Sequence, residues 1–177
     1  MTATTVAPWS VPIRINEVAE DGRAVAISAD AAVRTAAAKA AGVDAVTRLE
    51  ATFDLHHRGR DGLHVTGTVA AAVRQTCVVT LEPVENELSE AVDLVFSPTA
   101  PQSAGETVGI AERDGPERLA NGVVDLGVVA IEFLILAIDP YPRKPGAVFQ
   151  APASGDPEAK PFAALETLKK DTDGNPG

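Results

Sequence analysis

The chain has 177 residues, 45% of them hydrophobic and 23% charged, which is typical of one folded domain and excludes a wholly disordered chain. Fifteen Lys and Arg residues against 25 Asp and Glu residues give a net charge of −10, which excludes an extended nucleic-acid groove because phosphate binding depends on cations. The single cysteine, Cys77, excludes an intramolecular disulfide and a zinc site built from several thiolates.

The N-terminal part predicts two short strands and one helix. Residues 11–18 alternate between apolar and polar side chains, as in a half-buried strand, and Pro12 favours an edge position. A turn at Asp21 and Gly22 separates this strand from a second one at residues 23–27. Residues 31–41 are rich in alanine, so they predict a helix that is capped by Asp30 and ended by Gly42.

Residues 45–77 carry the clearest pattern, an antiparallel hairpin with one apolar and one polar face. The apolar positions begin with Ala45, Thr47 and Leu49 in the first half, and the link at residues 58–62 is short enough for a hairpin turn. A further strand follows the break at Glu82 and Pro83. It turns Val84, Leu88, Val92, Leu94 and Phe96 inward and Glu85, Glu87, Ser89 and Asp93 outward.

Residues 97–121, rich in Pro, Gly and acidic side chains, predict a flexible loop. Asp125 then caps a second helix at residues 126–138, which is apolar nearly all round and is expected to form the central core helix. The predicted fold is α+β: a mainly antiparallel twisted sheet of about five strands on this helix, plus the alanine-rich helix. One domain at residues 1–149 is followed by a largely disordered tail at residues 150–177.

Localisation is expected to be cytoplasmic. Residues 1–9 lack the charges and the apolar core of a secretory signal, and the run at residues 126–138 is too short to cross a bilayer. The single thiol agrees with a reducing compartment.

Cys77 and Glu132 are the first candidates for chemistry. Strand alternation points Cys77 to the apolar face, away from His56 and His64, so we expect a buried, unreactive thiol with a raised pKa. Glu132 interrupts an apolar helix, so it is expected to pair with Arg14, Arg74 or Arg143, to lie on the exposed edge of the helix, or to be functional.

A metal site is a weaker candidate. If the hairpin link spans residues 58–62, His56 falls opposite His64, and Asp54 lies on the same face. Two imidazoles and a carboxylate are able to hold a divalent ion, and they are the basis of a metal-dependent hydrolase as a third functional hypothesis. Solvated histidines near a turn are the simpler interpretation. The chain contains no phosphate loop, dinucleotide fingerprint, zinc-finger pair or nucleophile elbow, which favours a binding or assembly factor without a cofactor over an enzyme.

Two charged sets are candidate binding surfaces. No Lys or Arg occurs at residues 75–112, and an acidic face there is a possible docking surface for a basic protein. Its members are Glu82, Glu85, Glu87, Glu90 and Asp93. The opposing set consists of the arginines that could contact RNA phosphates: Arg58, Arg60, Arg74 and Arg143.

Three segments of the chain, by their order and the spacing between them, resemble the YceD family of large ribosomal RNA subunit accumulation proteins. They are the opening WSVPI from Trp9, the central CVVTLEP with Cys77, Leu81 and Pro83, and the closing DLGVVAIEFL with Glu132. The resemblance covers residues 9–149 and implies a cytoplasmic, non-enzymatic factor needed for 23S ribosomal RNA synthesis, processing or stability. Many relatives carry a C-x-x-C pair where this chain has Cys77 and Thr80, so a site with two thiolates cannot form here.

The charge balance and the resemblance together favour an indirect effect on ribosomal RNA. We expect the acidic face to bind a basic large-subunit ribosomal or assembly protein, with no membrane and no DNA as partners. The alternative is direct binding of precursor ribosomal RNA through the arginine set.

Overall fold

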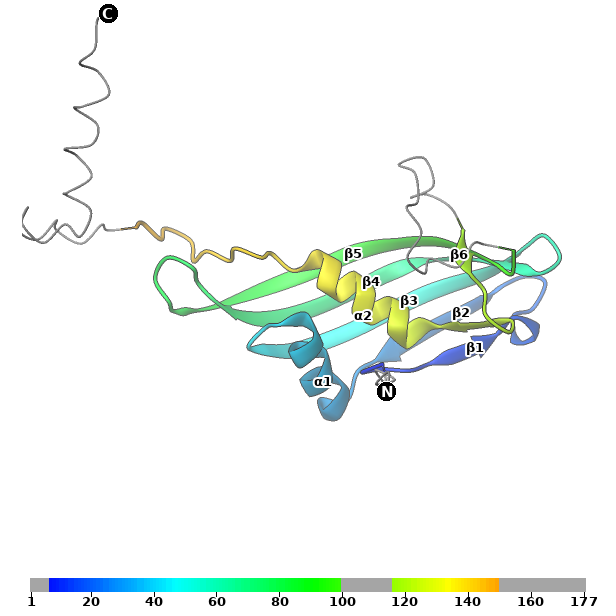
Figure 1. Ribbon diagram of the computed structural model, residues 1–177, viewed down its shortest axis with the longest axis horizontal. Coiled ribbons are helices and arrows are strands. Elements are labelled where there is room, and N and C mark those ends of the chain that lie inside the picture. The colour runs from blue at the N-terminus through cyan, green and yellow to red at the C-terminus, as the bar shows by residue number, and fades with distance from the viewer. Residues whose placement is uncertain (1–6, 100–115, 150–177) are drawn as a thin grey trace, which may run out of the picture.

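The computed structural model describes residues 7–99 and 116–149. Within these residues a five-stranded sheet has the order β2-β3-β4-β5-β6, and a two-stranded ladder joins β1 to β7. Helices α1 and α2 lie over one face of the large sheet (Figure 1). The elements are β1 (Pro12–Arg14), the 3-10 helix η1 (Ile15–Glu17), β2 (Arg23–Ser28), α1 (Ala31–Ala41), β3 (Ala45–Arg58), β4 (Gly62–Thr76), β5 (Pro83–Ser97), β6 (Glu117–Arg118), β7 (Val123–Asp125) and α2 (Leu126–Ala137).

The expected α+β class is confirmed, with one difference in the sheet. β2, β3, β4 and β5 are antiparallel neighbours, whereas β6 runs parallel to β5 and makes the sheet mixed. A parallel pair needs a long connection, and residues 98–116 separate these two strands in the sequence. Most of the loop expected at residues 97–121 lies outside the described residues. Its last part is ordered, because β6 pairs with β5 and Leu119 is buried.

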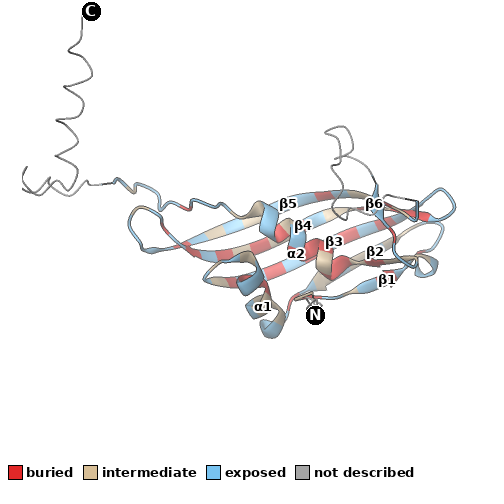
Figure 2. Cartoon of the chain, viewed as in Figure 1, coloured by how far each residue is buried: buried red, intermediate tan, exposed pale blue. Residues whose placement is uncertain are grey.

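The predicted hairpin is confirmed, and its register places His56 opposite His64 and His57 opposite Leu63. The prediction of which side chains point inward fails at the start of β3. The register shifts between Val46 and Arg48, so Val46 is buried and Thr47 is exposed, the reverse of simple alternation. Such a bulge inserts one residue and exchanges the two faces of the strand beyond it. The alternation of buried and exposed positions is regular from Leu49 to His56 (Figure 2).

The strand expected at residues 11–18 is shorter than predicted. β1 ends at Arg14, and the chain then turns through η1, where the Glu17 carboxylate accepts a hydrogen bond from the Arg14 backbone N–H at 3.0 Å. This local side-chain bond competes with continuation of the strand. The edge position predicted from Pro12 agrees with the structure, since β1 pairs only with β7 among the described strands.

Both predicted helix caps are present. The Asp30 carboxylate accepts from the Val33 backbone N–H at 2.8 Å, and Gly42 ends α1 in the left-handed conformation. The Asp125 carboxylate accepts from the backbone N–H groups of Gly127 and Val128 at the start of α2, at 3.0 and 3.3 Å. It also accepts from the Ser10 hydroxyl at 2.6 Å and the Val11 N–H at 2.7 Å. One side chain therefore caps α2 and fixes the N-terminal segment beside it.

α2 is the core helix, but it is not buried all round. The side that faces the sheet contributes Leu126, Ala130 and Leu134 to the core, whereas Ile135 and Leu136 on the outward side are exposed. A helix that covers a single sheet buries only the stripe in contact with that sheet. Among the described residues, no helix is long and apolar enough to cross a membrane.

Candidate functional site

The predicted acidic residues gather along β5, the strand next to the short β6. β4 pairs with β5 along its whole length, whereas β6 pairs only with Phe96 and Ser97. The edge of β5 from Pro83 to Val95 is therefore open among the described residues. We use the name acidic β5 edge for the four exposed carboxylates on this stretch: Glu85, Glu87, Glu90 and Asp93.

The acidic residues do not form one face. Glu85, Glu87 and Asp93 project from the sheet face opposite the helices, as predicted. Glu90 has the parity of Leu88 and Val92, so it lies on the other side of the strand. Glu82 lies before β5, where its carboxylate accepts from the Lys144 ammonium at 3.0 Å. This hydrogen bond and the Lys144 charge lower the pKa of Glu82.

Each carboxylate on the outer face has a cationic or titratable partner, from the adjacent β4 or, across β4, from β3. Glu85 lies 3.4 Å from an Arg74 nitrogen, Asp93 Oδ1 lies 2.7 Å from His64 Nε2, and Glu87 accepts a hydrogen bond from Arg48. The bond to Glu87 and its charge raise the pKa of Arg48. The side chains of Glu85, Glu87 and Asp93 are 71–78% exposed, so these pairs are solvated and contribute little to stability.

The structure does not bring the four predicted arginines together. Arg58 and Arg60 lie at the β3–β4 turn, whereas Arg74 lies near the other end of β4, about 40 Å away at the rise of an extended strand. Arg143 belongs to that second end, because the neighbouring Pro142 carbonyl accepts from the Val78 N–H in the β4–β5 turn. Two separate pairs replace the single arginine set expected from the sequence.

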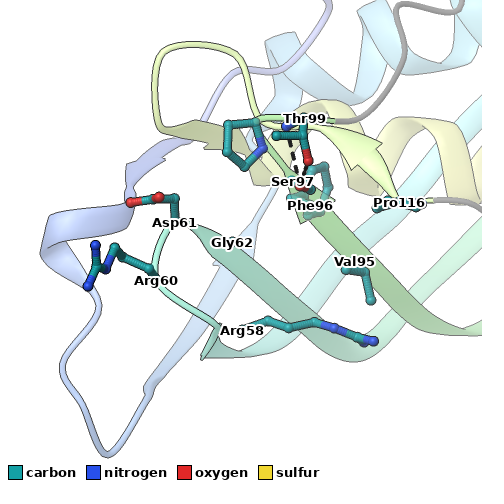
Figure 3. Close-up of a pocket in the computed structure, with 10 residues that line it drawn as sticks. Arg58, Arg60, Asp61, Gly62, Val95, Phe96, Ser97, Thr99 and Pro116 are labelled. Carbon is teal, nitrogen blue, oxygen red and sulfur yellow. Dashed lines mark hydrogen bonds between the residues drawn. The ribbon is translucent and has the colours of Figure 1, made fainter.

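A cavity of about 510 Å³ lies between the β3–β4 turn and the end of β5. Arg58, Arg60 and Asp61 line it from the turn, and Ser97 and Thr99 line it from the end of β5 (Figure 3). The Arg58 side chain runs toward Val95, whereas Arg60 points the other way, beside Asp61 (Figure 3). Since the two guanidinium groups diverge, the cavity does not present them to a single phosphate.

The three residues of the weaker metal candidate, His56, His64 and Asp54, are not brought together as a metal site. His56 and His64 are register partners, but His64 contacts Asp93, and the His56 ring packs against Gly22 on the β2 side, where a Cβ would lie 2.5 Å from it. Among the described residues, no group of three or more His, Cys, Asp and Glu side chains could hold a metal ion.

Cys77 is buried as predicted, but the expected rise of its pKa is wrong. The sulfur accepts from the backbone N–H groups of Val79 and Thr80 at 3.4 Å and of Lys144 at 3.3 Å. The Thr80 side chain and these amides lower the pKa of the Cys77 thiol to about 6. Burial alone raises a thiol pKa, but donors that converge on sulfur favour the thiolate. In the sequence, the closeness of Thr80 to Cys77 was the signal that a turn could place hydrogen-bond donors on the sulfur and lower the thiol pKa.

Glu132 lies on the exposed edge of α2, one of its expected positions. No salt bridge to Arg14, Arg74 or Arg143 is present within the described residues. Partial burial and the nearby charge of Glu117 raise the pKa of Glu132.

The remaining residues of the three segments that resemble the YceD family differ in their burial. Trp9 is buried beside the start of α2, and Pro83 is the exposed first residue of β5. Leu81 is 76% exposed and has a φ of 59°, so the turn before β5 presents an apolar side chain to solvent.

Comparison with known families assigns the chain to a class of ribosomal RNA accumulation factors. The family described as Large ribosomal RNA subunit accumulation protein YceD matches residues 65–169, more than half of the chain. The chain therefore belongs to the YceD family. The match covers residues 65–169, so it begins after the opening segment at Trp9 and continues beyond residue 149, whereas the resemblance was expected over residues 9–149. No curated protein and no solved structure gives a match.

Proposed function

We propose that the protein supports the accumulation of large-subunit 23S ribosomal RNA as a non-enzymatic factor that binds a basic large-subunit ribosomal or assembly protein along the acidic β5 edge. The family supports the role in large-subunit ribosomal RNA accumulation. The observation that carries the mode of action is the coincidence of an open strand edge with four exposed carboxylates.

An open strand edge offers backbone N–H and C=O groups to an added extended segment. Carboxylates project from β5 on both sides, so a segment rich in Lys and Arg would meet an acidic side chain on either face. The pairs with Arg48, Arg74 and His64 do not prevent this, because solvated ion pairs exchange partners at little cost.

The same charges support an indirect action on ribosomal RNA. The chain carries a net charge of −10, and its arginines lie in two pairs at opposite ends of the sheet. Neither pair neutralises enough phosphates for tight RNA binding at cellular salt. The protein would act in the cytoplasm on a protein component of the assembling subunit.

The test is co-purification of large-subunit precursor particles with a variant that lacks three of the four negative charges of the acidic β5 edge. The variant Glu87→Gln, Glu90→Gln, Asp93→Asn removes three negative charges without placing new cations beside Arg48. The matched control Glu20→Gln, Asp21→Asn, Asp61→Asn makes the same change in net charge at exposed turn positions.

We expect the edge variant to lose the particles and the control to retain them, with both variants folded by circular dichroism. Crosslinking in cells followed by separate identification of bound protein and RNA tests the partner class. Equal co-purification of the edge variant would refute the docking surface. Saturable binding of bare precursor RNA, weakened by salt and by Arg58→Gln with Arg60→Gln, would favour direct RNA contact instead.

A further inference from the structure

The outward side of α2 is apolar and exposed. Val128, Glu132, Ile135 and Leu136 follow the helical spacing of four, seven and eight residues, so they share the side turned away from the sheet. Ile135 is 44% and Leu136 is 76% exposed. The outward side of a surface helix normally carries polar residues, so this one is expected to have an occupant.

A second copy of the chain fits this surface poorly. A symmetric dimer through α2 would bring the two Glu132 carboxylates near each other, since an isologous contact pairs the same patch with itself. Each chain also carries a net charge of −10. The occupant therefore needs apolar side chains together with cations.

The C-terminal sequence beyond the described residues has this chemistry. Phe162, Leu165 and Leu168 recur at intervals of three, and Lys160, Lys169 and Lys170 flank them. The family match ends at residue 169, directly after the last of these apolar residues. The segment therefore belongs to the part of the chain that the family shares.

The connection is long enough. Phe149 is the last described residue, and residues 150–161 span up to about 40 Å when extended. α2 ends at Ala137, 12 residues before Phe149, so at most about 40 Å of chain separates Phe149 from the last turn of α2, and residues 150–161 can span the return to Ile135 and Leu136.

We propose that residues 161–170 of the same chain dock on the outward side of α2, with Phe162, Leu165 and Leu168 against Ile135 and Leu136. Lys169 or Lys170 would then approach Glu132, which has no ion pair among the described residues. The tail thus shields an apolar surface that the sheet domain leaves exposed. The acidic β5 edge takes no part in this contact.

The experiment uses the full chain with a photoreactive benzoylphenylalanine in place of Leu136. After illumination at low protein concentration, the crosslinked peptides are identified by mass spectrometry. A second chain with the photoreactive residue in place of exposed Tyr141 reports non-specific capture. The test variant is Leu165→Asp. Its matched control is Thr167→Asp, which introduces the same charge at a position outside the spacing of Phe162, Leu165 and Leu168.

We expect crosslinks from position 136 to residues 161–170 within a product of monomer mass. Leu165→Asp should reduce their yield roughly tenfold, because it removes the burial of one leucine, and Thr167→Asp should leave the yield within about twofold. Crosslinks in a product of dimer mass would assign the surface to a second copy and overturn the proposal. Absence of crosslinks to the tail, or equal effects of the two Asp variants, would also overturn it.

Discussion

Gly127→Ala tests whether the N-terminal segment or the helix itself decides the stability of α2. On helix propensity alone, alanine in place of glycine stabilises a helix by about 1 kcal/mol. The structure predicts the opposite sign, because a Cβ at Gly127 would lie 2.8 Å from the Trp9 carbonyl carbon and 2.9 Å from the Ser10 nitrogen. These are backbone atoms, so no side-chain rotation relieves the overlap.

The magnitude follows from the displacement that alanine requires. A contact of 2.8 Å falls about 0.7 Å short of van der Waals distance, so the segment at Trp9 must move away from α2. Overpacking of this kind costs about 1–3 kcal/mol, and complete loss of Trp9 burial would cost about 3 kcal/mol or more. After the propensity gain, we expect Gly127→Ala to lower the free energy of unfolding by up to about 2 kcal/mol.

Urea unfolding followed by both fluorescence and circular dichroism measures this effect. Trp9 is the only tryptophan, so its emission reports the N-terminal segment, whereas circular dichroism reports the whole domain. Ala36→Gly in the middle of α1 is the reference substitution for helix propensity and should lower the free energy of unfolding by about 1 kcal/mol. A higher urea midpoint for Gly127→Ala would refute the reasoning, because it would show that the Trp9 segment does not restrict the helix.

Three further predictions concern single side chains. Asp125→Ala should lower the free energy of unfolding by about 2–3 kcal/mol in urea titrations, because it removes the α2 cap and the hydrogen bonds from Ser10 and Val11. Asp125→Asn should lower it less, because the amide oxygen still accepts hydrogen bonds. The lowered pKa of Cys77, about 6, predicts that its contribution to stability grows as the pH rises from about 6 to the unfolded value of about 8.5 and is lost below 6. The urea midpoint of the wild type relative to Cys77→Ser should rise over this window, and a flat difference would contradict the thiolate. The raised pKa of Glu132 predicts that its charged form destabilises the fold above that pKa when no cation of the docked tail is beside it, so in a Lys169→Gln, Lys170→Gln background Glu132→Gln should unfold at higher urea than its parent at neutral pH but not below about pH 4.

The candidate site was predictable in its residue types and not in its geometry. The spacing of Glu85, Glu87 and Asp93 determined that they share one side of a strand. Their partners Arg74, Arg48 and His64 are 11 to 39 residues away in the sequence, and only the register of β3, β4 and β5 places them alongside. The separation of Arg58 from Arg74 follows from the length of β4, because Arg58 ends β3 just before the turn into β4 and Arg74 lies near the far end of β4.

The sequence by itself determined the local elements of this protein, because capping, turns and alternation depend on neighbouring residues. Asp30, Gly42 and Asp125 mark helix ends through bonds to the adjacent backbone, and the apolar alternation after Arg48 fixes which side of β3 is buried. Tertiary structure decided the rest, since the remaining features depend on contacts between distant segments. The bulge at Thr47, the return of Lys144 to Cys77 and the exposure of one side of α2 all result from packing that no local pattern contains.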